Sequence, residues 1–216
     1  RLGVRRHNIF VTDLEGVVFK GREALMDRWK AEFAQDTAKR TLADVIPGAD
    51  VFLGLSAAGV LKADLLKGMA DKPLIMALAN PVPEIMPDLA RDVRPDAMIC
   101  TGRSDFPNQV NNVLCFPYIF RGALDVRATT INEDMKIAAA NALAQLARED
   151  VPDDVAAAYQ GNRPKFGPGY IIPVPFDPRL ISAIPVAVAK AAMASGVARK
   201  PITDLAISDA LERQLA

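Results

Sequence analysis

Short apolar runs alternate with helix-like segments along the first half of the chain. The runs are apolar without strict alternation, which is typical of strands covered on both faces of a sheet, and they lie at residues 8–13, 50–55, 73–80 and 97–102. The segments between them repeat their apolar residues at helical spacing and lie at residues 22–36, 41–46, 62–70 and 83–93. This alternation predicts βαβ units and an α/β fold built on an open, parallel sheet.

The second half of the chain has a different pattern. Residues 112–126 and 132–150 are long and helical in their apolar spacing, and residues 180–198 predict one more helix. Residues 150–180 are dense in proline and glycine, so we expect this segment to be irregular and to wrap over a neighbouring surface. The tail, residues 199–216, predicts a polar connector that leads into a short helix.

Composition restricts the classes of partner. The chain has 216 residues, 50% of them hydrophobic, and its 26 basic side chains balance its 26 acidic ones. It therefore has no basic field to hold nucleic acid or an anionic membrane surface. No apolar run reaches the roughly 18 residues that a membrane helix needs, and the N-terminal residues do not resemble a signal peptide. Cys100 and Cys115 lie in apolar surroundings that suit free thiols, so we expect a cytoplasmic protein.

The residues that follow each strand of an open α/β sheet lie at its ligand crevice. Asp13 ends the first run and is suited to accept from the ribose hydroxyls of a dinucleotide, although aspartate is also a common turn residue. Asn80 ends the third run directly before Pro81, where it either orients a ligand or caps the next helix. The stretch Gly54–Gly59 is rich in small residues, which either let the backbone approach a flat or phosphorylated ligand or serve tight helix packing.

Carboxamides gather directly before the first long helical segment. Asn108, Gln109, Asn111 and Asn112 follow the fourth run, so we expect them at the same edge of the sheet as Asn80. A carboxamide carries donors and an acceptor without a charge, so it can orient a carboxylate, a hydroxyl or a nicotinamide amide. One asparagine is enough to cap a helix. The adjacent pair therefore favours ligand binding, with capping as the alternative.

Five stretches carry a resemblance to a known family. They read VTDLEGVVFKGR, ADVFLGLSAAGVLK, LIMALANPVPEI, CTGRSDFPNQVNNVLCFPYIFRGALDV and IIPVPFDPRLISAIPVAVAKAAMASGVA. Together, and above all through NPxPE and QVNNVxxFP, they resemble the cofactor-binding domain of malic enzymes over residues 2–200, with the greatest similarity to the long bacterial, NADP-dependent form. The resemblance implies an oxidoreductase that oxidises L-malate with NAD(P)⁺ and decarboxylates the product to pyruvate and CO₂, using Mg²⁺ or Mn²⁺.

The resemblance also implies roles for particular residues. Asn80 and Asn112 would bind the nicotinamide cofactor and the substrate at the reaction centre, with Asn111 beside the substrate. When the residues at the ends of the first two runs are added, the expected cofactor-binding residues are Asp13, Gly54, Leu55, Ser56, Ala57, Asn80 and Asn112. The acids Asp13 and Glu15 favour NAD because they repel a 2′-phosphate. The resemblance to the NADP-dependent form favours NADP, with the counter-charge supplied by Lys20, by Arg22 or by the missing upstream segment.

Other functional groups of the family have no match in these residues. The resemblance implies that a strand, a Gly-rich GxGxxA turn and most of a helix belong before the first residues, RLGVRR, so we expect the first βα unit to be missing. The general-acid tyrosine, the general-base lysine and the three carboxylates that hold the metal would lie further upstream. We therefore expect no catalytic residue and no metal ligand in this chain, and no activity from it alone. Five residues do not match those family positions: Lys20, Asp105, Tyr118, Tyr159 and Tyr170.

The resemblance divides the chain into three parts. Residues 1–160 would form a partial, doubly wound Rossmann-type domain that binds NAD(P), residues 161–198 a Pro/Gly-rich wrap with a closing helix, and residues 199–216 a connector toward a further, acyltransferase-like domain. The expected partners are L-malate, the N-terminal malic domain of the same protein and further copies in a homo-oligomer. One alternative is a non-catalytic dinucleotide-sensing or oligomerisation module. Another is a different amino-acid or hydroxy-acid dehydrogenase of doubly wound fold, which the pairing of NPxPE with QVNNV disfavours.

Overall fold

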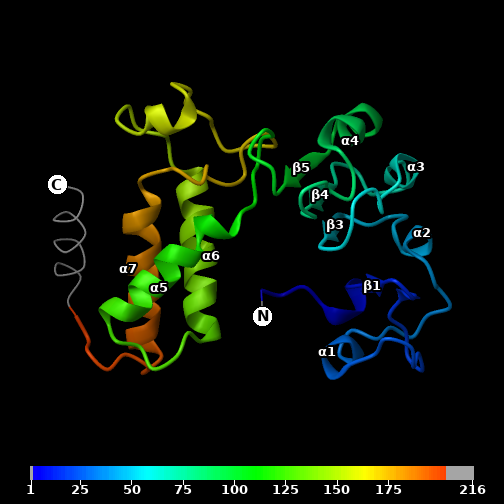
Figure 1. Ribbon diagram of the computed structural model, residues 1–216, viewed down its shortest axis with the longest axis horizontal. Coiled ribbons are helices and arrows are strands. Elements are labelled where there is room, and N and C mark those ends of the chain that lie inside the picture. The colour runs from blue at the N-terminus through cyan, green and yellow to red at the C-terminus, as the bar shows by residue number, and fades with distance from the viewer. Residues whose placement is uncertain (1, 203–216) are drawn as a thin grey trace. The chain divides into compact units, whose positions relative to one another are not determined.

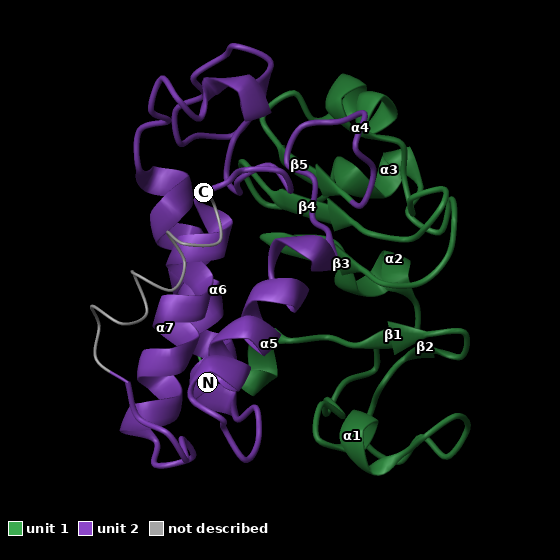
Figure 2. Cartoon of the chain, turned by 60° about the vertical axis from the view of Figure 1, so that its left-hand side comes forward, with its two compact units in different colours: residues 1–101 green, residues 102–216 purple. Residues whose placement is uncertain are grey.

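The computed structural model describes residues 2–202 and divides the chain into two compact units, residues 1–101 and residues 102–216 (Figure 2). The boundary between the units follows the last strand of the sheet, whereas the resemblance extends the first domain to residue 160. From residue 203 onward, the expected connector lies outside the described residues.

Helices and strands follow one another along the chain as Figure 1 shows. Unit 1 contains the short 3-10 helix η1 (Arg6–Asn8), then β1 (Thr12–Asp13), β2 (Gly16–Val17), α1 (Arg28–Ala31), α2 (Leu42–Val45), β3 (Val51–Gly54), α3 (Ala63–Leu66), β4 (Leu74–Ala77), α4 (Pro87–Val93) and β5 (Met98–Thr101). Unit 2 contains η2 (Asn112–Leu114), α5 (Phe116–Asp125), α6 (Glu133–Arg148), η3 (Ala156–Tyr159) and α7 (Leu180–Ala194).

A parallel sheet in the order β3-β4-β5 forms the centre of unit 1. Its register pairs Phe52 with Ile75 and Ile75 with Ile99, so these buried side chains form a row on one face of the sheet. Leu66 of α3 and Ala90 of α4 belong to the same buried cluster, which places these helices against that face. The expected α/β fold with a parallel, Rossmann-type sheet and flanking helices is confirmed.

The opposite face of β3 is open. Val51 and Leu53 are each 54% exposed, while Phe52 and Gly54 between them are buried. The unbroken apolar run predicted cover on both faces, but within unit 1 the described hydrophobic cluster includes Phe52 and neither of the exposed residues. Within unit 1, therefore, β3 is covered on one face.

The prediction for the first apolar run, residues 8–13, is wrong. Only its last two residues form a strand, β1, which pairs antiparallel with β2 across a turn in which Gly16 has φ of +88°. The main-chain acceptors further upstream are occupied by a side chain, because Gln35 Nε2 donates to the oxygens of Arg6 and Ile9 at 2.7 and 2.6 Å. The run is thus held by its pairing with β2 and by the side chain of Gln35, 26 residues away from Ile9, and does not join the parallel sheet.

The helices of unit 1 are shorter than their apolar spacing predicted. Residues 22–36 form only α1, because the Asp27 side chain accepts from the N–H groups of Trp29 and Lys30 and so starts the helix late. Leu25, just before this cap, has φ of 52°, which a continuing helix does not allow. The cap thus interrupts a segment whose spacing alone predicted one long helix.

Three helices, α5, α6 and α7, pack around one hydrophobic core in unit 2 (Figure 1). Leu114, Met135 and Ile184 are almost completely buried in it. Gly122 lets α5 approach α7 closely, since a Cβ at this position would lie 2.5 Å from the main-chain oxygen of Pro185. The helices expected at residues 112–126, 132–150 and 180–198 are confirmed as α5, α6 and α7, while the short helix expected in the tail lies outside the described residues. Among residues 2–202, no helix is both long and apolar enough to cross a lipid bilayer.

A buried polar cluster anchors the Pro/Gly-rich segment. The Tyr159 hydroxyl donates to Asp177 at 2.5 Å and lies 2.9 Å from the Tyr170 hydroxyl. The Arg179 guanidinium also donates to Asp177, whose side chain is fully buried. Burial opposes the ionisation of Asp177, but the hydrogen bonds from Arg179 and Tyr159 outweigh it and lower the pKa of this carboxyl. The segment is irregular apart from η3, as its composition predicted.

Candidate functional site

The carboxyl ends of β3 and β4 lie side by side, since the register pairs Gly54 with Ala77. Asn80 follows three residues after Ala77, in an exposed turn that contains a cis peptide bond to Pro81. Within residues 2–202, the Asn80 side chain has no hydrogen-bond partner. Its carboxamide is therefore free to bind a ligand, and the structure provides no helix-capping contact for it.

Glu84 connects these two strand ends. Its side chain is 0% exposed, and its carboxylate accepts from the N–H of Ser56 at 2.8 Å and from the N–H of Ala79 at 3.0 Å. A Cβ at Gly54 would lie 2.4 Å from the Glu84 carboxyl carbon, so the glycine leaves the space that the carboxylate fills. No role for Glu84, the last residue of NPxPE, follows from the sequence pattern. The available signal was an acid placed directly after Pro83 among apolar residues.

The expected cofactor stretch is mostly at the surface. Gly54 is buried under Glu84, whereas Leu55 is 74% exposed and both Ser56 and Ala57 are exposed. This loop follows β3 and so lies at the same edge of the sheet as Asn80, which follows β4. Gly54, Leu55, Ser56, Ala57 and Asn80 are thus brought together in unit 1.

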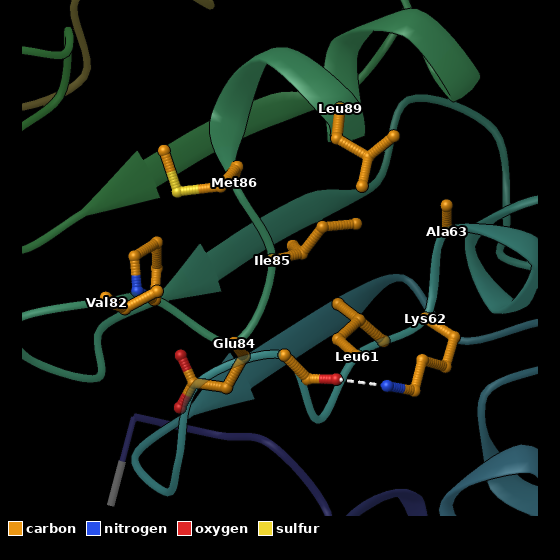
Figure 3. Close-up of a pocket in the computed structure, with 10 residues that line it drawn as sticks. Leu61, Lys62, Ala63, Val82, Glu84, Ile85, Met86 and Leu89 are labelled. Atoms are coloured by element: carbon orange, nitrogen blue, oxygen red, sulfur yellow. Dashed lines mark hydrogen bonds between the residues drawn. The ribbon is translucent and has the colours of Figure 1, made fainter.

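A shallow pocket of about 240 Å³ is lined in part by the segment that leads from β4 to α4 (Figure 3). Leu61, Ile85 and Leu89 give it a mainly apolar lining, and Lys62 at its margin donates to the main-chain oxygen of Gly59 at 2.9 Å. Asn80 does not line this pocket. Glu84, which connects the two strand ends, is part of the lining, so the pocket adjoins the edge where the expected ligand-binding residues gather.

Asp13 is tightly held by two cations. Both of its carboxylate oxygens accept from the Arg22 guanidinium, and one accepts from Lys30 Nζ at 2.8 Å. The N–H of Glu15 donates to the other oxygen at 2.9 Å. The hydrogen bond from Arg22, with the one from Lys30, keeps the pKa of Asp13 well below its ordinary value, although burial acts in the opposite direction.

This arrangement changes what Asp13 can do. A free carboxylate would repel a 2′-phosphate, but here two positive charges face one negative charge, and the Arg22 side chain is 4% exposed while that of Lys30 is 29% exposed. Lys20, in contrast, is exposed and lies 3.9 Å from Asp36. No sequence pattern indicates this role of Lys30, because Lys30 lies 17 residues from Asp13 and the two side chains meet only in the folded chain.

The carboxamides before α5 have three different environments. Asn108 is buried and spans a loop, since its Nδ2 donates to the oxygen of Pro168 at 2.8 Å and its Oδ1 accepts from the N–H of Ile171 at 2.9 Å. Asn111 caps η2 by accepting from the N–H of Val113 at 3.0 Å. Asn112 is exposed, and its side chain has no hydrogen-bond partner in the described part of the chain.

The remaining expected site residues belong to separate parts of the chain. Asn111 and Asn112 lie in unit 2, while Asn80 lies in unit 1, and Asp13 is in the β1-β2 hairpin. Among residues 2–202, no group of three or more His, Cys, Asp or Glu side chains is arranged to hold a metal ion. The open carboxamides of Asn80 and Asn112 fit a neutral, hydrogen-bonding ligand group such as a nicotinamide amide.

Comparisons with known sequences identify relatives over almost the whole chain. The family described as "Malic enzyme, NAD binding domain" matches residues 5–158. The NAD-dependent malic enzyme of Rhizobium meliloti (strain 1021) is 69% identical over 213 residues, which cover 98% of this chain and 28% of that protein. The NADP-dependent malic enzyme of the same organism is 67% identical over 204 residues, which cover 94% of this chain and 27% of that protein. The chain thus spans about a quarter of the length of these curated relatives.

Solved structures show the same relationship. The malic enzyme of Entamoeba histolytica matches with a TM-score of 0.79 at 36% identity, over 94% of this chain and 41% of that one. The malic enzyme of Pyrococcus horikoshii matches with a TM-score of 0.67 at 38% identity, over 79% of this chain and 36% of that one. The resemblance carried by NPxPE and QVNNVxxFP is therefore confirmed, and the chain belongs to the family of malic enzyme NAD-binding domains.

Proposed function

We propose that this chain is the cofactor-binding part of a malic enzyme, an oxidoreductase that converts L-malate and NAD(P)⁺ to pyruvate, CO₂ and NAD(P)H. The observation that carries the proposal is the open carboxamide of Asn80, which stands at the carboxyl end of a parallel strand without a partner among residues 2–202. Ligands of open α/β sheets bind at this end of the strands. The two Rhizobium meliloti relatives, named as NAD-dependent and NADP-dependent malic enzymes, support the same assignment.

Each carboxamide has a definite task in this proposal. A bound NAD(P)⁺ would supply the hydride acceptor. Asn80 would donate through Nδ2 and accept through Oδ1, and so would hold the nicotinamide amide and the malate hydroxyl in orientation. Asn112 would donate to the substrate carboxylate, with Asn111 beside it. The exposed main chain of Ser56 and Ala57 would lie against the cofactor.

The remaining chemical groups are proposed to come from outside these residues. The base, the acid and the ligands of Mg²⁺ or Mn²⁺ would be supplied by the N-terminal malic domain of a longer protein, in keeping with the 28% of the relative that this chain spans. We accordingly propose that these 216 residues alone do not turn over malate. Their contribution is binding and orientation.

We propose NADP as the preferred cofactor, although the relatives include both an NAD-dependent and an NADP-dependent enzyme. Arg22 and Lys30 neutralise Asp13 and leave a net positive charge beside it. Such a site tolerates a 2′-phosphate, which the acid alone would repel. Lys30→Met should lower kcat/KM for NADP at least about tenfold more than for NAD, because the ε-ammonium then no longer offsets the carboxylate. An equal effect on both cofactors would contradict this preference.

The proposed function is tested by removing the carboxamides in the full-length protein. Asn80→Ala and Asn112→Ala should each lower kcat/KM for malate on the order of 100-fold, since positioning contacts have effects of this size. Their unfolding temperatures should change little, because neither side chain completes a core or a cap in the described structure. Asn141→Ala, at an exposed position of α6, is the matched control. Variants that retain wild-type kcat/KM would refute the assignment.

A further inference from the structure

Glu84 is a buried carboxylate whose contacts all lie within unit 1. Figure 3 shows it on the segment between β4 and α4, with its carboxylate turned away from Ile85 and Leu89. None of the ion pairs among the described residues includes it. The main-chain N–H groups of Ser56 and Ala79 and the Ser56 hydroxyl, 3.4 Å away, are its partners.

The two carboxylate oxygens hold different strand ends. Oε1 accepts from Ser56, which follows β3, and Oε2 accepts from Ala79, which follows β4 and directly precedes Asn80. The backbone of Glu84 is fixed as well, because the N–H of Leu61 donates to its main-chain oxygen at 3.1 Å. The carboxylate therefore sets the spacing between the loop of Ser56 and the turn of Asn80.

A carboxylate links these loops in a way that an apolar side chain could not. Burying such a group is unfavourable unless hydrogen bonds compensate for the lost water, and the N–H groups of Ser56 and Ala79 provide this compensation. What an apolar side chain cannot do is direct two main-chain N–H groups toward fixed points. Gly54 reinforces this interpretation, since any side chain there would displace the carboxylate.

We propose that Glu84 is a positioning residue for the reaction. Its carboxylate holds the turn of Asn80 against the end of β3, so that the Asn80 carboxamide meets the nicotinamide and malate in reacting geometry. The inference rests on the proposed function of Asn80, which lies one residue beyond the Ala79 N–H that Glu84 binds. Glu84 acts through Asn80 and does not touch the reacting atoms.

The first test is Glu84→Gln in the full-length protein. Glutamine keeps the shape but has one NH₂ in place of an oxygen, so it can accept from only one of the two strand ends. We expect kcat with malate to fall about 10- to 100-fold while KM for NADP changes less than about threefold, because a misplaced Asn80 impairs orientation more than binding. Asp92→Asn removes an exposed acid from α4 and should leave both constants unchanged.

The second test perturbs the same carboxylate without changing it. Gly54→Ala places a Cβ 2.4 Å from the Glu84 carboxyl carbon and must move it. We expect this variant to show the same fall in kcat, and the double variant with Glu84→Gln to be little worse than either single one. Amide hydrogen exchange of Ala79 and Ser56 should be at least tenfold faster in each variant, since their common acceptor is lost or displaced.

The outcomes separate this inference from the proposed function. If Asn80→Ala impairs turnover while folded Glu84→Gln retains wild-type kcat, the positioning role of Glu84 is refuted and the function of Asn80 stands. If Asn80→Ala has no effect, the proposed function fails first, and the role of Glu84 fails with it. If Glu84→Gln does not fold, Glu84→Asp is tested in its place, because aspartate retains the charge and moves it back by one methylene. A failure of both variants to fold would overturn positioning in favour of a structural role.

Discussion

Asn108→Ala should loosen the loop that this residue spans. The Asn108 side chain, 7% exposed, makes a hydrogen bond to the oxygen of Pro168 at 2.8 Å and receives one from the N–H of Ile171 at 2.9 Å. Alanine removes both. At about 1 kcal/mol for each net hydrogen bond, the closed loop should lose about 2 kcal/mol relative to its open form. This corresponds to about a 30-fold change in the opening equilibrium.

The assay is amide hydrogen exchange in the full-length protein, followed over the peptide that contains Gly167–Ile171. The Ile171 amide should exchange about 30-fold faster in Asn108→Ala, because it loses its acceptor and the loop opens more often. Asn112→Ala is the matched control, since its exposed side chain makes no hydrogen bond to the described residues and should leave exchange at Ile171 unchanged. Unchanged exchange in Asn108→Ala, or equal acceleration in both variants, would refute the reasoning.

Three further predictions concern buried or charged groups. The pKa of Asp13 is lowered in the folded protein, so the ionised carboxylate stabilises the fold above its unfolded pKa of about 3.9, and this stabilisation is lost as pH falls through the lower folded value. The urea midpoint lost through Asp13→Asn should therefore be smaller at pH 2 than at pH 7. A loss that does not depend on pH would contradict this. Burial raises the pKa of Cys100 to about 11, so iodoacetamide at pH 8 should label this thiol at least about 100-fold more slowly in the native protein than in urea. Peptide mass spectrometry measures both rates, and comparable rates would show that the thiol is accessible. Tyr159→Phe removes the hydroxyl that donates to Asp177 and should destabilise the protein by about 1–3 kcal/mol in urea titrations. Tyr170→Phe should cost less, because among the described residues the Tyr170 hydroxyl bonds to Tyr159 and Arg179 and not to the buried Asp177 carboxylate; the reverse order would argue against the cluster.

The sequence by itself determined the elements whose signal is local. The sheet strands β3, β4 and β5 and the helices α5, α6 and α7 were predicted because a buried strand or a long amphipathic helix shows its periodicity within its own residues. NPxPE and QVNNVxxFP were enough to recognise the family, since they are contiguous in the chain. These features do not depend on what lies opposite them in space.

Only the tertiary structure decided which side chains meet. Lys30 reaches Asp13 from 17 residues away, and Glu84 reaches Ser56 from 28 residues away, so no sequence window contains either pair. The tertiary structure also separated the asparagines that the sequence presented as one group. Asn108 is occupied by partners that lie 60 and 63 residues further along the chain, while Asn112 has no such partner among residues 2–202. A hydrogen bond needs a second group within about 3 Å, and only the folded chain brings that group into place.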